Sequence, residues 1–479
     1  MGGREFDPNI DYYAPPCTPG TPGAALPSNG GATAQGVTAN SIEVVWFATN
    51  YGAVVNAILQ AEGLYETAGN IMTEAQYFEN FINTKYVLWG RKIHVDVFNS
   101  QCTAAPPDTQ CLNSEIDSIQ AKYHPYALLW DTTVCSSCYA EMAKDGMIGV
   151  GGFGFTDSFA NALAPYFYSP GESSTRTVEA FAQFYCNQLA GNPTAFAGDH
   201  NPAQTFNGKP RSLGVITPND PDNINAVEKV LEPALDSCGV GNQVRQHHYY
   251  YSQDPSRTAI ESQQAISAMG NTSTTPATTV LCLCDPVAPA FTYGREQNEN
   301  YWPEAIIASD QGMDDDIIGR SYESGTGCTG SPCEFDKAFG LSTVGPQLPP
   351  GKDPGYRVYA AGGGTGTPPV TALTADRDWA TIELVANLVE NTGPDLTPAR
   401  MQAAAPTLGI RGGGSTGYAA EGFAQGDYQE TQDARIVYYD NNAVSGYDGA
   451  KGAYVQEAGT PRYNLGQYPK TGNPNFPAR

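Results

Sequence analysis

The feature that most constrains the fold is a regular alternation between short apolar runs rich in β-forming residues and segments with helical periodicity. In the first part of the chain the apolar runs are SIEVVWFAT (residues 41–49), KIHVDVF (92–98), YALLW (126–130), GMIGVGG (146–152) and PYFYSPGES (165–173). Helical patterns occupy residues 51–90, 112–123 and 138–145 between them. Strands connected through helices form βαβ units, whose strands pair in parallel. The sequence therefore predicts an α/β protein.

The alternation continues in the second part of the chain. Further apolar runs are RSLGVITPND (211–220), QVRQHHYYYSQ (243–253), TTVLCLCD (278–285) and PEAIIASDQG (303–312), with helical patterns at 174–191, 223–239 and 257–270. Five runs precede Gly171 and four follow it. For a chain of 479 residues, we expect two doubly wound parallel sheets rather than one sheet of nine strands.

The pattern changes near Tyr356. The stretch YRVYAAGGGTGTPPV (356–370) predicts a strand and a loop. The stretch DWATIELVANLVENTG (378–393) predicts an amphipathic helix that ends at Gly393. DARIVYYDNNA (433–443) predicts a late strand, and the residues after it are expected to be loops.

Residues 1–37 are rich in Pro, Gly, Ala and Ser and have few side chains to bury, so they predict a tail or linker. The chain contains no apolar run of the ~20 residues that a membrane helix needs. No signal peptide is visible. The start MGGREF is typical of a shortened chain, and we expect the native targeting segment to be absent from this sequence.

The chain is acidic, with 25 Lys and Arg against 50 Asp and Glu, which gives a net charge of −25. A negative field of this size repels nucleic acid and anionic membrane surfaces. We therefore expect neither as a partner.

Eleven cysteines are many for a cytosolic chain of this length. Several occur as close pairs in short loops: Cys102 and Cys111, Cys135 and Cys138, Cys328 and Cys333. Such pairs predict structural disulfides in an oxidising compartment. The other five are an odd set, so one thiol should be free or paired outside this sequence. The histidines do not group with the cysteines, and no metal site is expected.

Several segments, taken in order, resemble the type I periplasmic solute-binding proteins, particularly the branched-chain amino-acid-binding branch that supplies ABC transporters. GVTANSIEVVWF resembles that family's opening strand, and YALLWDTTVCSSCYAEMAKDGMIGVGG its third strand, cleft loop, helix and fourth strand. PYFYSPGESSTRTVEAFAQFY resembles the segment that crosses into the second lobe. AIIASDQGMDDDIIG and DWATIELVANLVENTG resemble later positions. The likeness covers residues 37–440.

This resemblance implies two α/β lobes joined by a three-stranded hinge, with a small ligand held between lobes that close on it. Lobe I would comprise residues 38–172 and 355–435, and lobe II residues 173–354. Residues 436–479 would form the hinge return and pack on lobe II, and residues 1–37 would be the tail. It also implies a monomer that is periplasmic or a cell-surface lipoprotein, with a membrane ABC permease as partner. The tail, the additional cysteines and the longer C-terminal segment depart from the family.

Ligands of open α/β sheets bind beyond the carboxyl ends of the strands. The residues expected there are Asn50, Tyr51, Thr132, Thr133, Gly152, Phe153, Phe155, Asp220, Tyr250, Asp285 and Asp310. Thr132 and Thr133 match the family's serine-rich cleft loop, where hydroxyls at a helix N-terminus suit a carboxylate. The alternative for both is an ordinary helix cap, and each Asp has the same alternative as a cap or turn residue.

Four Asp residues and no Lys or Arg follow the predicted strands, counting Asp131. This balance disfavours phosphate and other multiply charged anions, which bind Arg forks. It favours a neutral, zwitterionic or cationic organic ligand, with aromatic side chains as apolar or cation–π walls. Because successive side chains of a strand alternate in direction, only one of Tyr250 and Tyr251 can face the cleft.

Two other functions compete with ligand capture. Cys135 and Cys138 have the CxxC spacing of thiol–disulfide oxidoreductases at a helix start, but VCSSCY lacks the Trp-Cys-Gly-Pro-Cys context, so a structural disulfide is favoured. The chain has no GxSxG, HExxH or phosphate-binding loop, so neither catalysis nor a cofactor is expected. A ligand sensor or adhesion module on the same fold is the remaining alternative.

Overall fold

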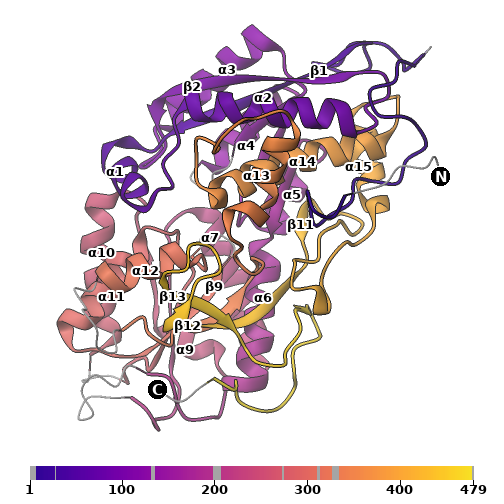
Figure 1. The fold of residues 1–479 in the computed structure, drawn as a ribbon. Helices are drawn as coiled ribbons and strands as arrows, with labels where there is room; N and C mark the ends of the chain where they lie inside the picture. Colours follow the sequence, from indigo (N-terminus) through magenta and orange to yellow (C-terminus); the bar gives the residue numbers. More distant parts are fainter. Residues whose placement is uncertain are drawn as a thin grey trace.

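The computed structural model describes residues 7–26, 28–130, 135–197, 206–271, 275–309, 313–325 and 334–476. Within them the chain forms two α/β lobes, each built around its own sheet (Figure 1). The first lobe lies at the top of the view and the second below it. The prediction of two doubly wound lobes is confirmed.

Lobe I contains a six-stranded sheet in which every neighbouring pair is parallel. In sheet order its strands are β11 (Gln429–Thr431), β5 (Phe167–Glu172), β4 (Ile148–Gly151), β3 (Ala127–Trp130), β1 (Ser41–Asn50) and β2 (Lys92–Thr103). Its helices are α1 (Gly52–Glu62), α2 (Ala68–Lys85), α3 (Thr109–Tyr123), α4 (Ser136–Lys144), α5 (Asp157–Leu163), α13 (Pro354–Ala361), α14 (Ala372–Thr392) and α15 (Pro398–Ala404). All four residues of β3 are buried. Helices cover both faces of such a sheet, which explains why its strands are continuously apolar.

Lobe II contains a mixed sheet. In order its strands are β13 (Lys451–Gln456), β12 (Asp433–Val444), β10 (Phe339–Ser342), β9 (Glu304–Ser309), β8 (Thr279–Cys282), β6 (Leu213–Pro218) and β7 (His248–Tyr251), and β14 (Tyr463–Asn464) pairs with β12. Its helices are α6 (Ser174–Phe184), α7 (Pro221–Asn225), α8 (Glu232–Asp236), α9 (Gly241–Gln246), α10 (Pro255–Met269), α11 (Ala288–Glu299) and α12 (Asp316–Gly325). β12 and β13 are antiparallel to their neighbours, and the other main strands pair in parallel.

Short helical turns complete the described structure. Two are π-helical, at Tyr185–Leu189 and Ala226–Leu231, and three are 3-10 turns at Pro350–Lys352, Ala405–Leu408 and Gly414–Thr416.

The chain passes between the two sheets three times: after β5, between β10 and α13, and between β11 and β12. The buried side chain of Arg462 holds two of these passages together. Its guanidinium donates to the carbonyl oxygens of Thr343, Val344 and Asp433 and forms an ion pair with the Asp433 carboxylate at 2.8 Å. The lobes are therefore joined by three adjacent connections, as a hinge requires.

The N-terminal segment packs on lobe I, although its composition predicted a tail. Asp11 is 4% exposed, and its carboxylate accepts a hydrogen bond from the Trp379 indole at 2.6 Å. The Tyr13 hydroxyl donates to the Ala419 carbonyl oxygen at 2.8 Å. Arg91 donates to the carbonyl oxygens of Asn29 and Gly31. The segment is fixed by polar contacts with residues distant in sequence, which composition cannot indicate.

Three local predictions differ from the structure. Residues 356–361 belong to α13 rather than to a strand, because Asp353 caps the Tyr356 amide and Pro354 occupies the first helical turn. The first part of the predicted strand at 243–253 is α9, and only β7 is extended. Residues 451–456, expected as a loop, form β13 against β12.

Disulfides join Cys102 to Cys111, Cys135 to Cys138, Cys186 to Cys238 and Cys282 to Cys284. Cys17 is the free and exposed cysteine of the described residues. Cys328 and Cys333 lie outside the described residues.

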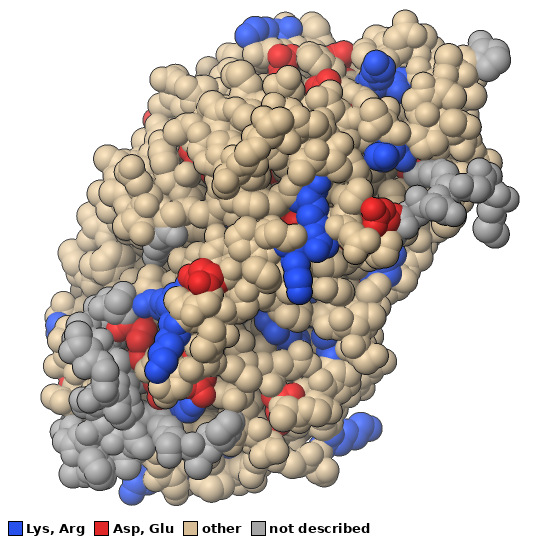
Figure 2. Space-filling view, in the orientation of Figure 1, with Lys and Arg blue, Asp and Glu red and all other residues tan. Residues whose placement is uncertain are grey.

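Charged side chains are scattered among uncharged ones on the face shown in Figure 2, where Lys and Arg do not gather into a basic surface. Among the described helices none is both long enough and apolar enough to cross a membrane.

Candidate ligand-binding cleft

A cavity of about 450 Å³ lies between the two lobes. Lobe I contributes the carboxyl end of β1, with Trp46, Phe47 and Thr49, and the first turns of α14. Lobe II contributes the loop after β8 and the start of α12. The cavity therefore lies where ligands of α/β sheets bind, and its volume is that of a small-molecule site.

Three of the predicted site residues line this cavity: Tyr51, Phe153 and Asp285. The Asp285 carboxylate accepts hydrogen bonds from the amides of Val287 and Ala288, at 2.8 and 3.0 Å, and from the Tyr251 hydroxyl at 2.8 Å. It thus holds the start of α11 in addition to forming part of the cavity wall.

Other predicted residues have structural roles away from the cavity. The Asn50 side chain accepts from the Gly52 amide at 3.0 Å. Phe155 is 3% exposed and stacks on Phe159 within lobe I, and a side chain at Gly152 would collide with Phe155 and Tyr139. These positions belong to the turn after β1 and to the core of lobe I.

The remaining predicted positions lie in lobe II or outside the described residues. Asp220 caps α7 through the amides of Asp222 and Asn223. Tyr250 is 37% exposed and donates to Glu228, whereas its neighbour Tyr251 is buried against Asp285. Strand alternation therefore turns Tyr251, rather than Tyr250, toward Asp285 and the core of lobe II, and neither tyrosine lines the cavity. Thr132, Thr133 and Asp310 lie outside the described residues.

Most of the residues that line the cavity do not follow the end of a strand, so the sequence analysis did not predict them. The N-terminal segment supplies Asp11, Tyr12 and Tyr13, the start of α13 supplies Asp353, and residues 418–431 supply further polar groups. The available sequence signal was local: Asp353 followed by Pro354 is a helix-start pattern. It locates a helix but not the surface against which the helix packs.

We call Asp11, Asp353, Asp376 and Glu383 the acidic wall, because all four line the cavity and influence one another. Burial raises the pKa of Asp376 well above its ordinary value, and the charges of Asp353, Asp11 and Glu383 add to this rise. Burial likewise raises the pKa of Asp353 to about 7, against the opposing hydrogen bonds from the Tyr356 and Gly355 amides. Charged forms of these carboxyl groups are therefore costly in the unliganded cleft.

Arg411 partly compensates the acids near one end of the cavity. Its guanidinium lies 2.9 Å from Glu430, 3.2 Å from Glu421 and 3.8 Å from Glu383, and also 4.9 Å from the centre of the Tyr13 ring. Burial still raises the pKa of Glu421 well above its ordinary value, and repulsion from Glu430 adds to the effect. One guanidinium thus serves three carboxylates.

Two contacts connect the lobes across the cleft. Arg377 on α14 forms an ion pair with Asp315, immediately before α12, at 2.8 Å. Asp315 is 1% exposed, and burial raises its pKa to about 7 although Arg377 opposes the rise. Beside the first hinge connection, where the Ser174 amide donates to the Phe155 carbonyl oxygen, the Thr156 amide donates to Asp222 at 2.7 Å. The structure therefore has the lobes in contact around the cavity.

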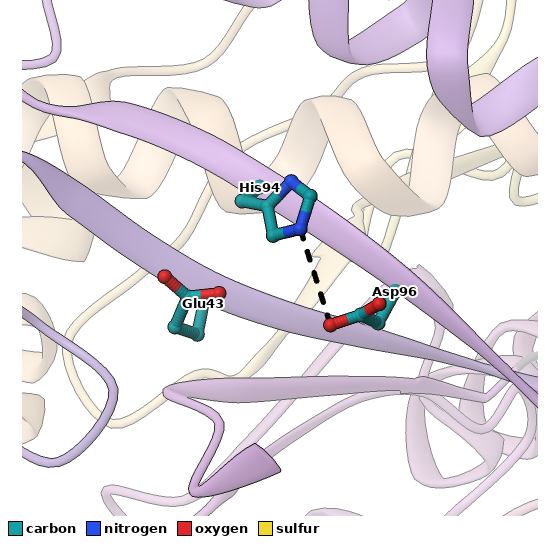
Figure 3. Close-up of side chains that lie close together, drawn as sticks. All are labelled: Glu43, His94 and Asp96. Carbon is teal, nitrogen blue, oxygen red and sulfur yellow. Dashed lines mark ion pairs between the residues drawn. The ribbon is translucent and has the colours of Figure 1, made fainter.

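Three groups of side chains among the described residues resemble cation sites in geometry, and one of them, Asp117, Glu141 and Asp145, lies on the lobe I surface at α3 and α4, away from the cavity. Oxygen atoms of Glu66, Glu74 and Asp378 lie within 4.8 Å of one another at the lobe I wall. Figure 3 shows the third group, with His94 and Asp96 on β2 and Glu43 on β1. The His94–Asp96 distance is 4.0 Å, and both side chains are well exposed, at 55% and 44%. The third group has the properties of an ordinary surface ion pair.

Comparison with known protein structures identifies the fold. No family model matches the sequence, and no curated protein matches it. A solute-binding protein of an ABC transporter from R. palustris, in complex with 4-hydroxybenzoate, superposes with a TM-score of 0.58 at 10% identity, covering 90% of this chain and 98% of the other. The chain has the fold of the type I periplasmic binding proteins.

Two further structures support this assignment. A branched-chain amino acid ABC transporter protein from Thermus thermophilus, with bound valine, has a TM-score of 0.58 at 10% identity and covers 90% of this chain and 98% of its own. A possible leucine/isoleucine/valine-binding protein from Rhodopirellula baltica has a TM-score of 0.56 at 10% identity and covers 87% and 96%. At such low identity the periplasmic binding protein fold is shared, while the bound molecules differ between these neighbours.

Proposed function

We propose that this protein is an extracytoplasmic solute-binding protein, which captures a small neutral, zwitterionic or cationic organic molecule between its lobes and delivers it to a membrane ABC permease. The observation that carries the proposal is the cavity between the lobes, lined from both sides at the carboxyl ends of parallel strands. The fold neighbours described as ABC transporter solute-binding proteins support the same class of function. The partners are the ligand and the permease, and the protein acts as a monomer.

Capture requires that the lobes open and close. The three connections between the sheets supply the hinge, and the Arg377–Asp315 ion pair forms only when the lobes meet. A ligand drives closure by contacting both lobes at once, since a ligand shifts an equilibrium only through its different affinity for the two states. The closed form is then what a permease recognises.

We further propose that the protein is not an enzyme. Cys135 and Cys138 are joined in a disulfide, and both are almost fully buried, at 3% and 0% exposure. Redox-active pairs need an accessible sulfur for thiolate attack. The burial supports a structural role, in which the disulfide fixes the start of α4.

The proposal is tested by a thermal-shift screen of the protein after unfolding and refolding to remove ligand bound during expression. The panel contains amino acids, amides, amines, sugars and aromatic acids. A ligand at ~100 times its dissociation constant adds about 2.7 kcal/mol to the stability. We expect one chemical class to raise the melting temperature and to reduce the radius of gyration in X-ray scattering. A refolded protein that responds to no class would contradict ligand capture.

A further inference from the structure

The polar lining of the cleft is strongly biased toward carboxylates. In the part of the chain that the structure describes, ten acidic residues line the cavity: Asp11, Glu66, Asp285, Asp315, Asp353, Asp376, Asp378, Glu383, Glu421 and Glu430. Among the described residues Arg377 is the one basic side chain of the lining, and it is paired with Asp315. Arg411 lies behind the lining and compensates three of the acids. The lining therefore has a large excess of carboxyl groups over basic groups.

The carboxyl groups of the acidic wall lie close enough together to raise one another's pKa. Burial raises the pKa of Asp376 and of Asp353, and repulsion from neighbouring carboxylates adds to both rises. Burial also raises the pKa of Asp11, where hydrogen bonds and the charge of Arg411 oppose the rise. A positive group placed among these carboxylates would relieve their repulsion, because opposite charges within a few ångströms favour the ionised form. An anionic group in the same place would add to the repulsion.

Aromatic rings surround the same cavity. The half-buried rings that line it include those of Tyr12, Tyr51, Tyr65, Phe153, Tyr418 and Tyr447. Tyr12 and Tyr418 are stacked with their centres 3.7 Å apart, and Tyr12 lies close enough to Asp353 and Asp376 for their charges to raise its pKa. Rings and carboxylates are thus adjacent at the acidic wall. An organic cation gains from both, through cation–π attraction and charge pairing.

We propose that the ligand of the cleft is an organic cation, a primary or quaternary ammonium compound whose charged group lies at the acidic wall against Tyr12 and Tyr418. The inference rests on the proposed function and narrows its ligand class. It also assigns a role to the N-terminal segment, because Asp11 and Tyr12 both come from it. The neighbours with bound 4-hydroxybenzoate and valine share the fold, but the acid excess of this cleft opposes a carboxylate ligand at the acidic wall.

The test compares ligands that differ only in charge. Isothermal titration measures the binding of choline against 3,3-dimethyl-1-butanol, its neutral isostere, and of cadaverine against 1,5-pentanediol. 4-Hydroxybenzoate, L-valine and CaCl2 are titrated in parallel. We expect at least one of the two cations to bind at least tenfold more tightly than its isostere. We also expect net proton release on binding at pH 6, because the cation makes ionisation of the acidic wall more favourable.

Variants then locate the site. Asp376→Asn removes one carboxyl group of the acidic wall that a cation would ionise, and Tyr12→Leu removes one ring. Each should weaken cation binding by at least tenfold while leaving the affinity for the neutral isostere unchanged. Asp117→Asn, an exposed acid on α3, is the matched control and should leave both affinities unchanged. The comparison of isosteres needs no variant, so the test stands even where a variant does not fold.

The possible results separate the two proposals. If 4-hydroxybenzoate, L-valine or a neutral isostere binds as tightly as the cations, ligand capture holds and the cationic ligand class is wrong. If only Ca²⁺ binds, the acids form an inorganic cation site and the organic-cation inference is likewise overturned. If no compound binds to the refolded protein here or in the broad screen, the proposed function fails and this inference fails with it.

Discussion

Replacing Glu74 with Gln should remove one proton's share of the fall in stability that rising pH causes. Glu74 lies on α2, is 1% exposed and has a carboxyl oxygen within 4.8 Å of oxygens of Glu66 and Asp378. Burial, together with the charges of Asp378 and Asp353, raises its pKa to about 10 from an ordinary 4.5. The folded protein therefore keeps a proton that the unfolded chain releases.

The sign and size of the effect follow from this difference. Below pH 4.5 both the folded and the unfolded chain hold the proton, so the full stabilisation is present. Above pH 4.5 the unfolded chain releases its proton while the folded chain keeps it, so the free energy of unfolding falls as the pH rises toward 10. One proton corresponds to about 1.4 kcal/mol for each pH unit. Between pH 4.5 and 7 the loss amounts to about 3 kcal/mol. Gln is neutral at every pH and close in shape, so it removes this loss.

Equilibrium urea unfolding at pH 5, 6, 7 and 8 measures the effect. The variant Glu74→Gln should be close to the parent protein at pH 5 and more stable than it at pH 7 by about 3 kcal/mol. Asp117→Asn, at an exposed position on α3, is the control and should reproduce the parent profile. Parallel pH profiles for Glu74→Gln and the parent would refute the assignment of a retained proton to Glu74.

Three further predictions concern the hinge, a disulfide and the N-terminal segment. Arg377→Ala removes the ion pair with Asp315, so the unliganded protein should show a larger radius of gyration in X-ray scattering; an unchanged radius would mean that this pair does not hold the lobes together. Replacing Cys186 and Cys238 with Ser opens a loop of 52 residues and should lower the free energy of unfolding by about 4 kcal/mol on the chain-entropy estimate, measured by urea unfolding. Deleting residues 1–16 leaves the Trp379 indole without its Asp11 partner and should lower the melting temperature; an unaltered melting curve would show that the segment is not part of the folded lobe.

The fold was predictable because its determinants are local and repeated. The continuous apolar runs at β1 and β3 are buried on both faces, as parallel strands covered by helices must be. The helix that ends at Gly393 was predicted with its end, although the structure buries it on most sides rather than on one face. At Tyr356 the β-forming side chains predicted a strand. The structure has a helix there, because Asp353 caps it and Pro354 occupies its first turn.

The residues of the candidate cleft could be predicted from the sequence only where they directly follow a strand. Tyr51, Phe153 and Asp285 follow strands and line the cavity. Phe155 follows the same strand as Phe153, but it turns into the core, because the direction of a side chain in an irregular turn depends on tertiary packing. Asp11 and Tyr12 belong to a segment whose composition indicates a tail. Their place in the cleft depends on contacts with Trp379 and Tyr418, which lie several hundred residues away in sequence.

Repulsion between buried carboxylates affects both the free energy of unfolding and the proposed closure of the lobes. Closing the lobes buries Asp315 beside Arg377 and encloses the acidic wall, so closure without ligand concentrates carboxylates in a space with little opposing charge. Rising pH should therefore favour the open form, just as it lowers stability through Glu74. A cationic ligand would reverse this preference, since it stabilises the ionised carboxylates of the closed cleft. The affinity for a cation should therefore increase with pH over the same range in which the free energy of unfolding of the protein alone decreases. The affinity for a neutral ligand should show no such increase.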